Sequence, residues 1–469
     1  MDFTHRDLLV AGCGAASAGA LAATAYSGGA AQSPGSSNAV VIPTAFGAVP
    51  NDVRMADRNV RAFNAAAAHA IESQAVLMVP AGTWFLTAEG RPGDGWNVTP
   101  GRNRRCRIIG EGITSIVKRA PANRAGKFAA MVRLWVTDGG ESFDIQGLCF
   151  DGNEAEFPYD PNDRWAFQQA HSVELASRSR TIAARSVLLR DIYLTGAVAD
   201  GFKIGAQCEE LRAQRVRAWG RTRRTRSDIQ FSRLPKLAVL EDILVDAFET
   251  EPWHMVSGAM MYLKDVAART KWDLLGPKGE VEGRLKVIGV NCRLGVAGSR
   301  DAAVTLIFHK VDGQFTGGAF ATGAPQDPKL SNRLRSSTLR FVGTQFHIGG
   351  GSFSSASPYP LIAHFAGHQD RLEFVDCSFT AEPTPAAGSY IDVAATAGFA
   401  NRLSLENCRT DGALDYVVTA ASPISIRASG GALRARKAIA KLGGALSTRP
   451  RIETQDRSKW TAPDLIVEE

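Results

Sequence analysis

Residues 186–254 carry one unit of sequence three times. Its long part reads VLLRDIYLTG at 187–196, ELRAQRVRAWG at 210–220 and LAVLEDILVDA at 237–247. After a short bend, a second and shorter run follows: FKI at 202–204, IQF at 229–231 and FET at 248–250. The long runs end near Gly196, Gly220 and Asp246, which are 24 and 26 residues apart. This period predicts the coils of a solenoid whose strands stack in parallel.

Alternating residues in these runs predict that one side of each strand faces the inside of the coil and the other side faces solvent. A single coil cannot bury its own apolar face, so stacked coils must share one apolar column. Equivalent outward positions then form a ladder with a spacing of roughly 5 Å. We expect such a long outer face to be able to hold an extended polymer.

The composition is that of a globular protein, with 45% hydrophobic and 22% charged residues over 469 residues. The formal net charge is +7. A basic balance favours anionic partners, such as an acidic polysaccharide, a nucleic acid or a charged surface, or serves solubility alone. No aromatic–basic RNA motif or recognition helix is present, so the sequence does not favour nucleic acid.

Residues 1–31 read as an export signal, with a short polar start, an apolar run and small residues before possible cleavage points after Ala25 or Ala31. The segment resembles a twin-arginine signal in which His5 replaces an arginine. Cys13 ends a sequence that matches a lipoprotein box, so lipid anchoring is a minor alternative. Residues 32–39 read as a linker. No later stretch is long and apolar enough for a membrane span, and we expect a periplasmic or extracellular protein.

Six cysteines follow the signal, at 106, 149, 208, 292, 377 and 408. Export would permit disulfides. Four of the six stand at similar places in strand-like runs, which predicts free, buried cysteines in a ladder. The spacing contains no zinc motif.

The stretch from residue 40 to residue 86 supports a specific resemblance. It contains Phe46-Gly47-Ala48, an Ala-rich helical stripe at 58–72 with Asp57 as its expected cap, and Val79-Pro80-Ala81-Gly82-Thr83-Trp84. These elements resemble the start of pectate-lyase-like proteins, and the resemblance implies that Phe46-Gly47-Ala48 and Val79–Trp84 are strands on either side of the helix. The resemblance implies an all-β, right-handed parallel β-helix with an N-terminal capping helix. We expect the parallel β-helix domain to cover 40–430, with insertions at 153–170 and 256–282. A C-terminal tail is expected to cover 431–469.

The candidate site lies on the outer face of the central coils. If Phe248 and Thr250 point inward, then Glu249 and Glu251 point outward. Lys203 and Gln230 take the place of Glu249 in the preceding coils, and Gly205 and Ser232 take that of Glu251. The candidate catalytic residues are Asp200, Lys203, Asp228, Glu249, Glu251 and Arg224. The candidate substrate-binding residues are Trp219, Arg221, Arg226, Trp253 and His254.

Two chemistries fit these residues. In a polysaccharide lyase, a base removes the proton next to a uronate carboxylate, and Lys203 or an arginine of 221–226 is at or near that base. An arginine, or a Ca²⁺ held by Glu249 and Glu251, neutralises the carboxylate. In a glycoside hydrolase, Asp200, Asp228 and Glu251 supply an acid and a base or nucleophile. Carboxylates on a solenoid face are also commonly just solvated.

We therefore expect an exported enzyme that cleaves an acidic polysaccharide by β-elimination. A glycoside hydrolase and a non-catalytic glycan-binding or surface protein are the alternatives. The motif sets of polygalacturonases are absent from the sequence. No cofactor is firmly indicated, apart from the possible Ca²⁺.

Overall fold

The computed structural model describes most of the chain after the predicted export signal and linker. Residues 1–38 lie outside the described residues, so those two predictions stay untested. The described residues are 39–90, 94–121, 129–157, 169–179, 181–220, 227–254, 259–274, 284–290, 293–294, 303–309, 312–315, 320–322, 338–343, 345–348, 363–365, 371–381, 389–393, 401–420, 424–443, 452–455 and 460–468.

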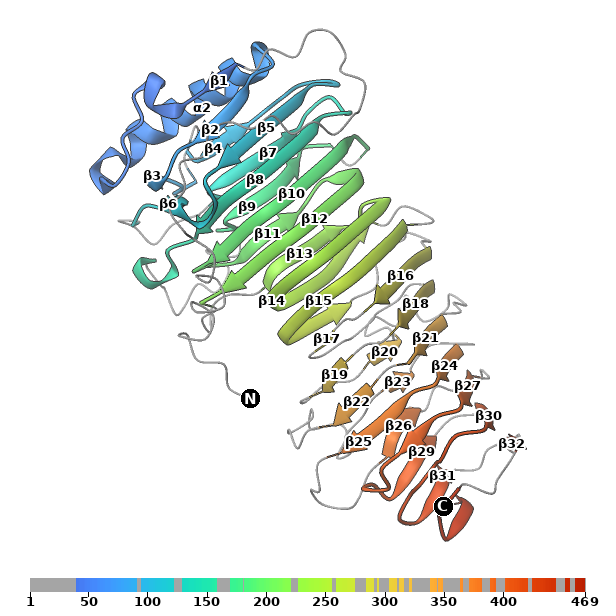
Figure 1. The fold of residues 1–469 in the computed structure, drawn as a ribbon. Coiled ribbons are helices and arrows are strands. Elements are labelled where there is room, and N and C mark those ends of the chain that lie inside the picture. Colours follow the sequence, from blue (N-terminus) through green and yellow to red (C-terminus); the bar gives the residue numbers. More distant parts are fainter. Residues whose placement is uncertain are drawn as a thin grey trace, which may run out of the picture. The chain divides into compact units, whose positions relative to one another are not determined.

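A helix, α2 (Ala56–Glu72), packs against the first strands at the N-terminal end of the described chain (Figure 1). Its buried stripe includes Val60, Phe63, Ala67 and Ala70, as the helical spacing predicts. The predicted cap is wrong: Met55 is the N-cap residue, and Asp57 lies in the first turn. Two short 3-10 helices precede α2, η1 (Pro43–Phe46) and η2 (Val53–Met55), and two follow later strands, η3 (Gly112–Thr114) and η4 (Glu154–Glu156).

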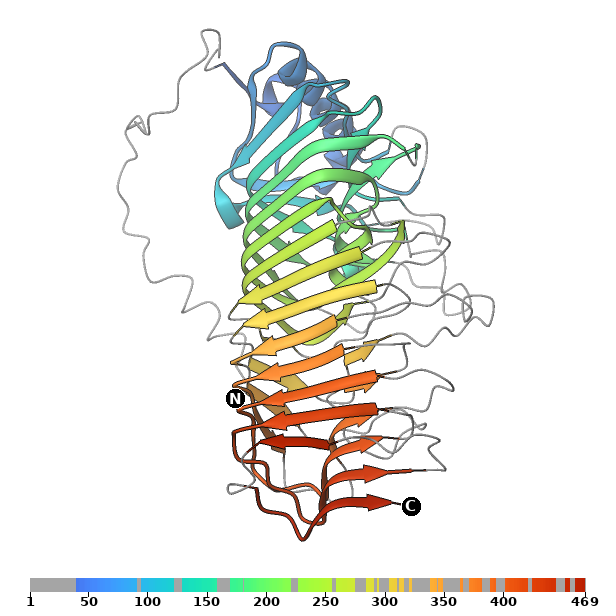
Figure 2. The ribbon, with the colours of Figure 1, turned by 90° about the vertical axis from the view of Figure 1, so that its right-hand side faces the viewer.

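The strands form parallel rows, in which each strand pairs with the equivalent strand of the next turn of chain. We call one turn of chain a rung. Figure 2 shows the strands of successive rungs lying one beyond the next. The first row consists of β1 (Val40–Val41), β2 (Val76–Val79), β5 (Arg105–Gly110), β8 (Ser142–Asp151), β10 (Ala183–Thr195), β12 (Gln207–Trp219), β14 (Leu237–His254), β15 (Ala259–Leu274), β16 (Arg284–Val290), β18 (Ala303–His309), β21 (Thr338–Val342), β24 (Arg371–Val375), β27 (Asn401–Glu406), β30 (Ile424–Ser429) and β32 (Ile452–Gln455).

A second row runs beside the first, and the long strands β8, β10, β12, β14 and β15 take part in both. The other members of the second row are β3 (Gly82–Leu86), β6 (Ser115–Arg119), β17 (Arg293–Leu294), β19 (Asp312–Phe315), β22 (Gln345–Ile348), β25 (Ser378–Ala381) and β28 (Arg409–Thr410).

A third row holds the short runs seen in the sequence. It consists of β4 (Trp96–Val98), β7 (Val132–Val136), β9 (Val173–Ser177), β11 (Asp200–Ile204), β13 (Ser227–Arg233) and the ends of β14 and β15. A separate parallel sheet follows in the C-terminal part: β20 (Phe320–Thr322), β23 (Ala363–Phe365), β26 (Ser389–Val393), β29 (Tyr416–Ala420), β31 (Ala438–Leu442) and β33 (Asp464–Glu468).

One residue in the left-handed region bends each long strand between the first and second rows. These corner residues are Gly147, Asp191, Arg215, Asp242 and Asp265, with φ between +53° and +66°. The bend shifts the alternation by one residue, so that Leu189 and Ile192 are both buried. Aspartate and glycine tolerate this conformation best. Arg215 is the exception, and both its Nε and its Nη2 donate to the carboxylate of Asp191, at 2.5 and 2.8 Å.

Three sequence expectations are wrong in this region of the fold. Phe46-Gly47-Ala48 is not a strand, because η1 ends at Phe46 and Gly47 turns the chain with φ +93°. The segment expected as an insertion at 256–282 contains β15, which pairs with β14 over twelve positions. Strands also continue beyond residue 430, through β31 to β33, where we expected a tail.

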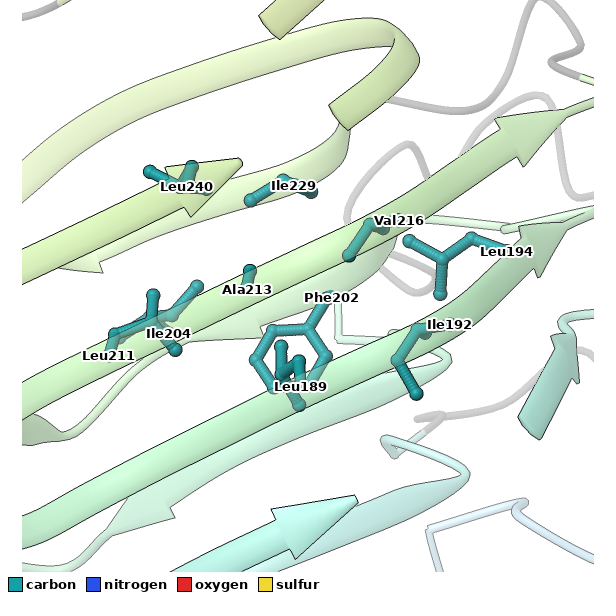
Figure 3. A pocket seen from close by; sticks show the side chains of 10 residues that line it. All are labelled: Leu189, Ile192, Leu194, Phe202, Ile204, Leu211, Ala213, Val216, Ile229 and Leu240. Carbon is teal, nitrogen blue, oxygen red and sulfur yellow. The ribbon is translucent and has the colours of Figure 1, made fainter. Parts of the chain in front are cut away.

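Inward side chains from the rows make one continuous apolar core. The cysteines at 149, 377 and 408 are free and buried, as predicted, and those at 106 and 208 are free and buried as well. The fourth predicted residue, Cys292, lies outside the described residues. Ten apolar side chains surround a small internal cavity between β10, β11, β12, β13 and β14 (Figure 3). Its volume of about 10 Å³ and its apolar lining suit neither a water molecule nor a sugar. No helix within the described ranges is long and apolar enough to cross a membrane.

Candidate functional site

The outward positions of the third row form a polar ladder, which we call the outer ladder. Within each strand the neighbouring positions, such as Phe202 and Ile204, are buried in the core. The strand register confirms the prediction that Lys203 and Gln230 occupy the place of Glu249. In chain order the register positions of the outer ladder are Asn97, Arg133, Glu174, Lys203, Gln230, Glu249 and Asp273. The side chain of Gln230 is buried, and those of Glu249 and Asp273 lie outside the described set.

A chain of polar contacts leads from Lys203 into the protein. Its Nζ lies 3.1 Å from Nε2 of His171 and 3.6 Å from Oε1 of Glu174. Nδ1 of His171 lies 3.0 Å from Oδ2 of Asp200, although the carboxylate is not aligned with the ring N–H direction. The Ser227 hydroxyl donates to Oδ1 of Asp200 at 2.7 Å. We call these five residues the His171 network. It joins β9, β11 and β13, which belong to three consecutive rungs.

The exposed fraction of the side chains rises along this network from the inside of the protein to its surface. The side chains of His171 and Asp200 are 0% exposed, while those of Lys203 and Glu174 are 14% and 18% exposed. Burial lowers the pKa of His171, and the opposing effect of Asp200 does not cancel it. We therefore assign a neutral ring with its proton on Nδ1 and its lone pair on Nε2, toward Lys203.

Arg119 supports the backbone of His171 from behind. Its guanidinium is buried and donates to the carbonyl oxygens of Ala88, Ala129 and His171, at 2.8, 3.1 and 3.0 Å. Burial lowers the pKa of Arg119 to about 9, so the group stays charged at neutral pH. The ring of Phe157 lies 5.9 Å from its Cζ atom. This buried cation fixes the position from which His171 reaches Lys203.

The two aspartates expected on the outer face are buried instead. Asp200 is 0% exposed and pairs in register with Ser227 rather than with Asp228. Asp228 is 4% exposed, and its Oδ2 accepts from the backbone N–H of Asp246 at 2.7 Å. Both lie where a third-row strand begins, and there each carboxylate accepts a hydrogen bond from a donor in the next rung, Ser227 for Asp200 and the backbone of Asp246 for Asp228.

The register also changes the expected place of Glu251. Between Phe231 and Arg233 the pairing shifts, so that Arg233 stands opposite His254. The pairing therefore does not support the prediction that Ser232 takes the place of Glu251 in the preceding rung. The backbone of Glu249, Glu251, Trp253 and His254 belongs to β14, but their side chains lie outside the described set.

The predicted arginine loop, with Arg221, Arg224 and Arg226, lies outside the described residues. Trp219 is described, and it stands on β12 with its ring edge against Tyr193, at a centroid distance of 5.9 Å. Among the described side chains, no hydrogen bond or ring contact joins Trp219 to the His171 network. Those side chains also contain no group of three metal-ligand residues, and the possible Ca²⁺ site at Glu249 and Glu251 stays a prediction.

The candidates chosen from the sequence do not include His171, Glu174, Ser227 or Trp135. The signal that could have found His171 is its place two residues before Val173, which corresponds to that of Asp200 before Phe202. To see this correspondence, one must know how the strands on either side of segment 153–170 pair. The sequence does not show this, because the length of the segment is unrelated to the repeat period.

Comparisons with known proteins add no activity to this geometry. No family model matches the chain, and no curated protein matches it. A crystal structure of the N-terminal fragment of gene product 12 of bacteriophage Phi29 is 14% identical, covering 91% of this chain and 71% of that one, with a TM-score of 0.45. A crystal structure of the Agl-KA catalytic domain is 13% identical, covering 94% and 69%, with a TM-score of 0.22. Because both scores are under 0.5, these likenesses carry no argument about fold or function, and the site must be interpreted from its own residues.

Proposed function

We propose that this chain is an exported right-handed parallel β-helix protein that cleaves an acidic polysaccharide by β-elimination. The observation that carries the proposal is the contact of Lys203, on the outer ladder, with the buried His171–Asp200 pair. A long polar ladder suits an extended polymer. The partly exposed amine of Lys203, in contact with the buried His171–Asp200 pair, suits proton transfer.

The reaction asks for a base beside the proton next to the uronate carboxylate. Lys203 first gives one Nζ proton to solvent, and its amine stays in contact with Nε2 of the neutral His171. The neutral amine of Lys203 then accepts the sugar proton. The electron pair of the broken C–H bond forms the carbon–carbon double bond as the glycosidic oxygen leaves, and that oxygen takes up a proton from water.

The burial of Asp200 and Asp228 disfavours hydrolysis by two of the three expected carboxyl groups, while the Glu251 side chain lies outside the described set. A glycoside hydrolase needs two carboxyl groups that flank the scissile bond. Asp200 is fully buried, with one oxygen bound by Ser227 and the other beside His171. Asp228 is buried and binds a backbone N–H. Neither of these two carboxyl groups faces a polymer on the outer ladder.

The experiment that tests the proposal compares the wild type with Lys203→Gln on a panel of uronate and neutral polysaccharides, with and without Ca²⁺. An unsaturated product, detected by its ultraviolet absorbance, identifies β-elimination. Loss of an acid–base group lowers kcat about 10²- to 10⁴-fold. The matched control is Lys264→Gln, because Lys264 belongs to another row and pairs with Glu241 at 2.6 Å.

Each other outcome contradicts a defined part of the proposal. New reducing ends without the absorbance identify a hydrolase. Binding without any turnover identifies a glycan-binding protein. Equal activity of Lys203→Gln and Lys264→Gln removes Lys203 from the reaction. Export is tested separately by the mass of the protein recovered from the periplasm or medium, which is expected to lack the first 25 or 31 residues.

A further inference from the structure

Trp135 occupies an unusual place for an aromatic residue, because it stands on the outer side of β7 instead of in the core. It is half-buried, while its neighbours Leu134 and Val136 are fully buried. Its Nε1 donates to Oδ1 of Asn97 at 2.9 Å, and the Asn97 amide in turn donates to the carbonyl oxygen of Gly95 at 3.0 Å. The indole is therefore held in a fixed orientation at the surface.

Two guanidinium groups accompany this ring. The Cζ atoms of Arg133 and Arg178 lie 5.9 and 5.6 Å from the ring centroid of Trp135. Both distances permit a cation–π interaction, which orients the arginines without neutralising their charge. Within the described ranges, no carboxylate lies within ion-pair distance of either arginine.

The electrostatic surroundings also favour an anion. Arg133 lies close enough to the buried Arg119 to contribute to the lowering of its pKa, so positive charge accumulates here. The nearest acid on the outer ladder is Glu174, which pairs in register with Arg133, and its carboxylate approaches Lys203 at 3.6 Å. A guanidinium matches a carboxylate through two parallel hydrogen bonds.

We infer that Arg133, Trp135 and Arg178 form a subsite that binds the carboxylate of a sugar unit in an extended polymer. The nature of that polymer rests on the proposed function. The subsite stands two rungs from Lys203 along the outer ladder, because Arg133 pairs with Glu174 and Glu174 pairs with Lys203. With about 4.8 Å between rungs, the separation is roughly 10 Å. An extended oligosaccharide can bridge this distance.

The test measures binding by calorimetry in the Lys203→Gln background, where substrate is not consumed. The probes are a galacturonate tetrasaccharide and its fully methyl-esterified, neutral form. We expect Arg133→Gln and Arg178→Gln each to raise Kd for the charged probe about tenfold, because each removes a charge-assisted hydrogen bond. High salt is expected to shrink the difference. Arg212→Gln is the matched control, since Arg212 lies in another row and pairs with Glu210 at 2.6 Å.

The outcomes separate this inference from the proposed function. Equal Kd values for Arg178→Gln, Arg133→Gln and Arg212→Gln overturn the subsite, even if the wild type forms unsaturated products. Equal binding of the charged and neutral probes overturns it as well. If the two arginine variants weaken binding but the wild type cleaves no uronate polymer, the subsite stands and the lyase proposal fails.

Discussion

The buried imidazole of His171 predicts how the stability of this protein depends on pH. Burial favours the neutral ring in the folded protein, so the folded pKa lies below the ordinary value of 6.5. The resulting stabilisation is complete above the unfolded pKa and is lost as the pH falls through 6.5 toward the folded pKa. Between these two values the unfolded chain binds one more proton. The free energy of unfolding therefore falls by about 1.4 kcal/mol for each pH unit.

The assay is urea unfolding of the wild type and of His171→Gln between pH 8 and pH 5, followed by tryptophan fluorescence and by circular dichroism. Glutamine does not titrate, so the difference between the two proteins isolates His171 from the carboxylates. His69→Gln, which removes an exposed histidine, is the matched control. Parallel pH dependences of the wild type and His171→Gln would refute the reasoning. A wild type that gains stability at lower pH would mean that Asp200 keeps the ring charged.

Three other predictions concern packing and reactivity. Phe231→Ala removes a fully buried ring from the core and is expected to cost about 3–5 kcal/mol, measured as a shift of the urea midpoint at constant slope. Gly431→Ala places a Cβ onto the carbonyl oxygen of Cys408 at φ +71°. It should lower the midpoint, and an unchanged midpoint would contradict the turn. Burial raises the pKa of Cys106 to about 12, so a thiol reagent at pH 8 should label Cys106 only after unfolding, as read by peptide mass spectrometry.

The repeating unit could be predicted from the sequence because apolar and polar residue types alternate in β11 and β13, although in β13 every residue except Arg233 is buried. Phe202 pairs with Ile229, as the spacing of the runs implied. β15 escaped detection because Met260, Met261 and Tyr262 place apolar side chains on both sides of the strand, so its alternation is invisible in the sequence. In β31, alanines at buried positions carry too little hydrophobic contrast to distinguish a strand from a tail.

The candidate site was predicted in part, and the missing part depends on register. Lys203 could be assigned to the outer face because both of its neighbours in the run are apolar. The position of His171 could not be predicted. The segment 153–170 separates His171 from the preceding rung, and its length does not show which residues of the two rungs pair. Asp200 was misplaced because sequence alternation does not tell where a strand begins, and the first residue of β11 turns its carboxylate inward.

The single left-handed corner residue limits how this chain can change in length. Because the corner reverses the phase of alternation, loss or gain of one residue beside Asp242 would exchange the inward and outward side chains over the rest of that strand. Gain of a complete period adds a turn that brings its own corner and leaves the pairing of its neighbours intact. Tandem duplication of whole periods is therefore the tolerated route to a longer molecule. Each such event would add one position to the outer ladder without altering the residues already present.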